Sequence, residues 1–145
     1  MLKEVLDQSI TALKTLSDFS DDPDKRVLRG EVGKLNIVPD KCCIVMPEFK
    51  PPQTFGMIEE SREKELHFTP NYFVISAKHK KLEEAEDASM DLAVKVIQKI
   101  HETELFIDME GNSKHCYLEL TDIEWLERSA SICVIALEFT VKLQV

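Results

Sequence analysis

The stretch that decides the fold is residues 133–145, CVIALEFTVKLQV, in which every second residue from Cys133 to Val145 is apolar. Side chains of a β-strand point alternately to its two faces, so this pattern predicts a strand with one buried face. Thirteen residues at about 3.3 Å each span roughly 43 Å, whereas a compact chain of this length has a diameter of about 38 Å. We therefore expect the strand to be as long as the domain and its apolar face to reach beyond the domain's own core.

Two other stretches have the three- and four-residue spacing of apolar side chains that is typical of amphipathic helices. The first predicts a helix over about residues 1–16, which ends in the Asp- and Ser-rich segment 17–23. The second predicts a helix over about residues 82–101. Its start carries Glu83 and its end carries Lys99, an arrangement that matches the helix dipole.

Short runs rich in β-branched and aromatic residues predict further strands, at residues 32–38, 42–46, 66–68, 72–77, 104–109 and 115–120. The segment 110–113, which contains Gly111, predicts a hairpin between the fifth and sixth of these runs. The buried positions change from even to odd numbers near Thr121 and Asp122, which predicts a β-bulge there. The fold class is therefore α+β, a mainly antiparallel sheet of four to six strands with two principal helices packed on one face.

The length of 145 residues is that of a single domain, here residues 1–145. A long loop or arm is expected over about residues 50–64, because this segment has no period and contains two prolines and a glycine. Its apolar residues either contact a partner or pack back onto the domain's own core. The candidate interaction surface combines residues at or in this arm with polar residues of the last strand: Phe49, Phe55, Met57, Lys142 and Gln144.

The formal charge of −9 argues against general binding of nucleic acid, whose phosphates an acidic surface repels. A local basic patch remains at residues 78–81, KHKK, although charged residues also commonly protect the ends of exposed strands. The N-terminal residues form no apolar run of signal-peptide length and no stretch has the length of a membrane span, so we expect a cytosolic protein. The four cysteines are expected to be reduced and buried.

No spacing typical of a metal site, a phosphate-binding loop or a nucleophile elbow occurs in the sequence. Acidic residues that could in principle perform acid/base chemistry alternate with apolar ones, as on a solvated strand face: Glu119, Asp122, Glu124 and Glu127. We therefore expect no enzyme and no cofactor. A small-ligand or regulatory binding module stays open as an alternative, with a pocket lined by Phe73, Trp125 and Phe139.

The order of the elements resembles that of small tail-completion proteins of tailed bacteriophages, the tail-terminator and head–tail joining proteins. The resemblance rests on an N-terminal helix, a Pro-rich first half, the strand 72–77 that leads into the helix 82–100, and the closing hairpin that ends in ALEFTV at 136–141. It implies a homo-oligomeric ring, commonly a hexamer, that caps the tail tube and carries the surface to which the head attaches. Its partners would be the tail-tube and head-connector proteins, and its locations the bacterial cytoplasm during assembly and then the virion tail.

Overall fold

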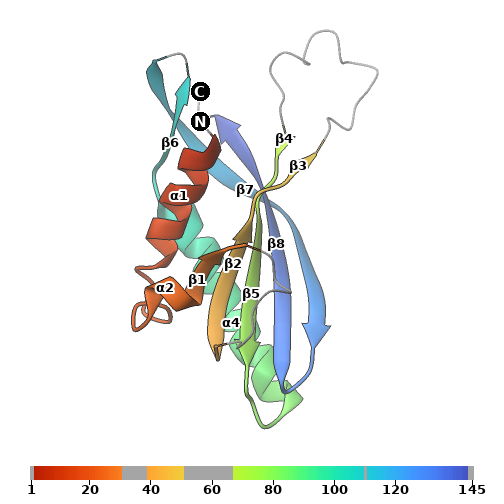
Figure 1. The fold of residues 1–145 in the computed structure, drawn as a ribbon. Coiled ribbons are helices and arrows are strands. Elements are labelled where there is room, and N and C mark those ends of the chain that lie inside the picture. The colour runs from red at the N-terminus through yellow and green to blue at the C-terminus, as the bar shows by residue number, and fades with distance from the viewer. Residues whose placement is uncertain (1, 31–38, 51–66, 110, 144–145) are drawn as a thin grey trace, which may run out of the picture.

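The computed structural model describes residues 2–30, 39–50, 67–109 and 111–143 (Figure 1). Its helices are α1 (Leu2–Leu13), α2 (Pro23–Arg26) and α4 (Leu82–Glu102). Its strands are β1 (Val27–Arg29), β2 (Lys41–Met46), β3 (Phe49–Lys50), β4 (His67–Phe68), β5 (Asn71–Ala77), β6 (Leu105–Met109), β7 (Asn112–Arg128) and β8 (Ile132–Leu143). The class is α+β, as predicted.

Six strands form one twisted, curled sheet in the order β1-β2-β5-β8-β7-β6, and β3 and β4 form a separate two-stranded ribbon. The prediction of a mainly antiparallel sheet is corrected, because the sheet is mixed: β1 runs parallel to β2 while the other neighbours are antiparallel. The parallel pair involves a strand that the sequence pattern did not predict, β1, while the predicted strand 32–38 lies outside the described residues. Parallel neighbours cannot be joined by a tight turn, and eleven residues separate Arg29 from Lys41.

Only one of the two predicted helices is long. α4 has 21 residues and matches the prediction, whereas α1 has 12 and ends at Leu13 instead of residue 16. After Leu13 the N–H groups of Thr15 and Leu16 donate to carbonyls three residues back, and the Thr15 hydroxyl also bonds the Ala12 carbonyl at 2.6 Å. This tightening ends the regular α-helix one turn before the apolar spacing does.

The main core lies between the helices and one face of the sheet. It contains Leu6 of α1, Val96 of α4 and Leu137 of β8, together with alternate residues of β2 and β5. A buried hydrogen bond of 2.7 Å between the Ser9 and Tyr72 hydroxyls links α1 to β5. The opposite face has a smaller apolar cluster, and all its members belong to strands: Leu28, Cys42, Ile44, Met46, Phe73, Ile75, Ile132 and Val134. The sheet is therefore covered by helices on one face.

The pair β7–β8 is the largest unit of the sheet. β8 pairs with β5 along one edge and with β7 along the other. The predicted bulge near residue 121 is confirmed by a register shift between Leu120 and Asp122, and a second shift lies between Trp125 and Glu127. The predicted hairpin is also confirmed, since Met109 of β6 pairs with Asn112 of β7 and Gly111 has a φ of +82°.

The edge strand β6 is held against α1 by one side chain. The Gln8 amide accepts a hydrogen bond from the Phe106 N–H at 2.8 Å and donates one to the Phe106 carbonyl at 3.0 Å. The side chain thus pairs with both backbone groups of Phe106, as a neighbouring strand would. One donor and one acceptor of the edge strand are therefore no longer free to pair with another chain.

We expect Gln8→Ala to lower the free energy of unfolding by about 1–2 kcal/mol, because both backbone groups of Phe106 lose their partner. Chemical denaturation followed by circular dichroism measures this change. Gln98→Ala, a change of the same type at an exposed position of α4, should change stability by less than about 0.5 kcal/mol. Equal effects of the two substitutions would show that the contact with β6 contributes nothing.

Candidate functional site

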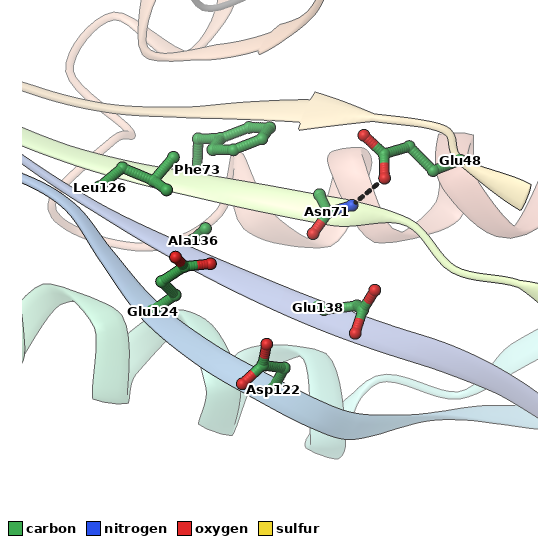
Figure 2. Close-up of a pocket in the computed structure, with 8 residues that line it drawn as sticks. All are labelled: Glu48, Asn71, Phe73, Asp122, Glu124, Leu126, Ala136 and Glu138. Atoms are coloured by element: carbon green, nitrogen blue, oxygen red, sulfur yellow. Dashed lines mark hydrogen bonds between the residues drawn. The ribbon is translucent and has the colours of Figure 1, made fainter. Parts of the chain in front are cut away.

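The side of the sheet away from α4 has a hollow of about 240 Å³ (Figure 2). Its lining consists of eight residues: Glu48, Asn71, Phe73, Asp122, Glu124, Leu126, Ala136 and Glu138. Four of the eight are acidic, and we call it the acidic hollow. These residues come from β5, β7, β8 and the link between β2 and β3. In Figure 2 the carboxylates lie around apolar side chains of the central strands.

Strand register explains why these residues meet. Glu138 of β8 lies opposite Asn71 of β5 and Asp122 of β7, and the next row toward the other end of β5 joins Phe73, Ala136 and Glu124. Directly opposite residues share a face of the sheet, so the two rows form the floor and one rim of the hollow. Leu126 follows Glu124 by two residues and so lies on the same face and lines the same hollow, and the register shift between Trp125 and Glu127 leaves it without a partner on β8.

Glu48 completes the rim through two hydrogen bonds. Its carbonyl accepts the Thr69 N–H at 2.7 Å, and its side chain accepts the Asn71 amide, also at 2.7 Å. Asp122 and Glu124 are exposed, and within the described parts of the chain no basic side chain forms an ion pair with either. Asp122 and Glu124 therefore present negative charge in the hollow that no described basic side chain pairs with, and this charge favours a cationic occupant.

The acidic residues singled out from the sequence are thus only partly brought together. Asp122 and Glu124 lie in the hollow, while Glu119 and Glu127 are not among its lining residues. Glu119 lies instead 3.9 Å from the Lys142 ammonium. Glu48 and Glu138 were not selected from the sequence. They come from other elements, and only the pairing of β5, β8 and β7 places them beside Asp122.

A second surface lies along the junction of α4 and β7. All the large apolar side chains that the described residues leave exposed belong to these two elements: Leu82, Met90, Val94, Tyr117, Ile123 and Leu126. Glu86 of α4 forms an ion pair with Arg128 of β7, which fixes the side of the helix that faces the strand. Met90 follows Glu86 at four-residue spacing and lies toward that side, whereas Val94, eight residues from Glu86, is turned away from the buried face of α4.

On β7, Ile123 lies opposite Leu137 and Trp125 lies opposite Ile135, so both are on the sheet face that α4 covers. Ile123 is 54% exposed, and Arg128 stacks over the Trp125 ring at 5.2 Å. We call Met90, Ile123 and Trp125 the apolar stripe. Beside it runs a strand edge: β6 pairs with β7 only as far as Cys116, and no other strand in the described ranges pairs with the outer edge of β7 beyond that residue.

The candidate interaction residues chosen from the sequence do not form one surface. Lys142 is exposed near the end of β8, and Phe49 begins β3 at the base of the predicted arm. Phe55, Met57 and Gln144 lie outside the described residues, as do the predicted strand 32–38 and the predicted arm 50–64 apart from Lys50. The apolar stripe was not recognised from the sequence, because Met90 lies outside the periodic apolar face of the helix and only the fold places that side of α4 toward β7.

The aromatic pocket of the alternative reading is not formed. Phe139 is fully buried and Trp125 packs against the same main core, whereas Phe73 lies on the opposite face of the sheet. A broader hollow of about 760 Å³ lies between the end of α4 and the β6–β7 hairpin and brings His101 and His115 to its lining. No group of three or more His, Cys, Asp or Glu side chains in the described ranges could hold a metal ion.

No protein-family model matches the chain, and no curated protein matches it in sequence. Among the helices that the structure describes, none has the length and apolar character needed to cross a membrane.

All four cysteines are free and buried, as predicted. Burial raises the pKa of Cys42 to about 12 and also raises the pKa values of Cys43 and Cys116. Since a thiolate is the reactive form, these side chains are poor nucleophiles in the folded protein.

We expect the free energy of unfolding to fall as the pH rises above about 9, because the thiols of Cys42, Cys43 and Cys116 ionise there in the unfolded chain while burial keeps them protonated in the folded chain. The contribution is fully present below the ordinary thiol pKa and is lost as the pH rises toward the raised values. Urea denaturation at pH 8 and at pH 10.5 measures it. Cys43→Ala should reduce the loss between the two pH values, and an unchanged loss would contradict the assignment.

Proposed function

We propose that this chain is a structural subunit of a phage or prophage tail, of the tail-terminator or head–tail joining type. It assembles into a ring at the end of the tail tube and mediates attachment of the head. The observation that carries the proposal is the long outer edge of β7 beside the apolar stripe, a surface suited to contact with another chain. The order of elements that led to the family resemblance supports it as well.

A strand edge presents N–H and C=O groups that can pair with a strand of another chain. Beyond Cys116, β7 continues for twelve residues to Arg128. The bulges at Leu120/Asp122 and Trp125/Glu127 interrupt the regular spacing of these groups, so only a partner with matching irregularities can pair along the full edge. Such an edge favours a specific contact over indiscriminate aggregation.

The apolar stripe supplies the hydrophobic part of this contact. Met90 is 46% exposed and Ile123 54%, and the third residue of the stripe, Trp125, has Arg128 stacked on its ring. Interfaces between proteins commonly have a large aromatic or arginine side chain near the centre, surrounded by residues that exclude water. An exposed apolar group of this kind marks an interaction surface more often than a single exposed residue does.

The binding-module alternative has less support, because the aromatic residues expected to line its pocket lie on opposite faces of the sheet. The acidic hollow, at about 240 Å³, is smaller than the roughly 300–1,000 Å³ of typical small-molecule sites. The broader hollow at the end of α4, at about 760 Å³, is within that range, but none of the three expected aromatic residues lines it.

The test uses tail tubes assembled from the tube protein of the same phage or prophage genome. We expect the purified chain to cap the tube ends as rings in negative-stain electron microscopy. Ile123→Lys should reduce the fraction of capped ends by at least about tenfold, because it places a charge within a desolvated contact. Leu82→Lys, at an exposed position of α4 outside the stripe, should leave capping unchanged.

Circular dichroism and the thermal midpoint of each variant show whether it is folded. Failure of the folded wild-type chain to bind tail tubes would rule out the proposed function. Equal capping by wild type and Ile123→Lys would instead leave the function standing and exclude the apolar stripe as the contact.

A further inference from the structure

Residues 78–81, Lys-His-Lys-Lys, form a basic turn between β5 and α4. Two backbone hydrogen bonds hold it: the Lys78 N–H donates to the Ser131 carbonyl at 3.1 Å, and the His79 N–H donates to the Ala130 carbonyl at 3.0 Å. The His79 ring also bonds the buried Ser76 hydroxyl at 2.7 Å. The turn is thus fixed to the β7–β8 connection, and its conformation is set before any partner binds.

The three lysines of the basic turn are exposed, and within the described ranges none of them forms an ion pair with an acidic side chain. Lys95, by contrast, forms an ion pair with Asp18 at 3.1 Å. In a chain of formal charge −9, a cluster of three unpaired cations is a local exception. Its ammonium groups are available to a second molecule.

The basic turn and the acidic hollow lie at opposite ends of β5. Asn71 begins this strand beside the hollow, and Ala77 ends it at the turn. Phe73, the other β5 residue of the hollow, shares a row with Glu124 and lies four residue steps from Ala77, roughly 13 Å at about 3.3 Å each, which is farther than a lysine side chain reaches. The two charged surfaces therefore do not neutralise each other within one chain.

We propose that the basic turn of one copy docks into the acidic hollow of a second copy. The inference rests on the self-association in the proposed function and names a contact for it. The occupant is chosen by charge: Lys80 and Lys81 can place their ammonium groups beside Asp122 and Glu124. Their aliphatic stems can at the same time cover the apolar floor at Phe73, Leu126 and Ala136.

This contact joins two different surfaces, so it is heterologous. A heterologous contact repeats from copy to copy. It closes into a ring when a whole number of the rotations between neighbouring copies makes one full turn. It also gives the ring a direction, because every subunit offers its turn on one side and its hollow on the other. The outer edge of β7 and the apolar stripe can contribute to the same or to a second interface.

The experiment is sedimentation velocity on the full chain at protein concentrations up to about 0.5 mM, at low salt and at high salt. We expect concentration-dependent association that weakens at least about tenfold between roughly 0.05 and 0.5 M NaCl, because exposed charges are screened. Lys80→Glu/Lys81→Glu and, separately, Asp122→Lys/Glu124→Lys should each weaken low-salt association by at least about tenfold through repulsion between like charges. Wild-type chain that stays monomeric at low salt overturns the proposal.

The decisive variant combines both reversals in one chain. Its turn is acidic and its hollow carries two lysines, so association should recover to within about threefold of wild type. Lys3→Glu/Lys25→Glu and Glu4→Lys/Asp91→Lys are matched controls, since they make the same charge changes at exposed positions elsewhere. The contact is overturned if the two charge reversals weaken association no more than the controls do. It is also overturned if the combined variant associates no more strongly than the weaker of the two reversal variants.

Two further outcomes would assign other occupants and overturn the inference. One is binding of duplex DNA by the basic turn, with unchanged self-association of Lys80→Glu/Lys81→Glu. The other is loss of tail-tube binding in Asp122→Lys/Glu124→Lys while self-association stays unchanged. Failure of the proposed function is a different outcome. A chain that associates by this contact but caps no tail tubes would support the contact and contradict the tail function.

Discussion

The pairing of β8 with both β5 and β7 is the constraint on which the rest of the structure depends. β8 alternates strictly, so its register decides which side chains enter the helix-covered core and which remain on the other face. Leu137 packs into the core while Ala136 and Glu138 become part of the acidic hollow. A shift of one residue would exchange these two sets and remove the core and the hollow together.

The bulges of β7 turn this regular pairing into a shaped surface. Without the first bulge, the parity of β7 would place either Leu120 or Ile123, but not both, on the side that α4 covers. The same change of parity places Asp122 and Glu124 on the opposite face, where they line the hollow. Bulges also increase twist, which is consistent with the curl of the sheet in Figure 1. The edge proposed for assembly and the hollow proposed for docking thus have a common physical origin.

Local patterns were sufficient to predict much of the fold. The alternation in β8, the periodicity of α4, the turn at Gly111 and the bulge near Thr121 all depend on neighbours in sequence. The end of α1 and the parallel pairing of β1 do not, because they depend on competing local hydrogen bonds and on the path of a connection. The site was harder for the same reason: Asn71, Asp122 and Glu138 meet only through strand order, which no local pattern encodes.

The two faces of the sheet have different physical tasks. On the helix-covered face, apolar burial and the paired Ser9 and Tyr72 hydroxyls stabilise the single chain. On the other face, Asp122 and Glu124 of the acidic hollow are exposed and form no ion pair within the described ranges. A chain of net charge −9 repels its own copies at long range, so a specific contact between copies needs local attraction that exceeds this repulsion. A fixed basic turn facing an apolar-floored acidic hollow provides that attraction at short range, and it acts only in the orientation that brings the two together.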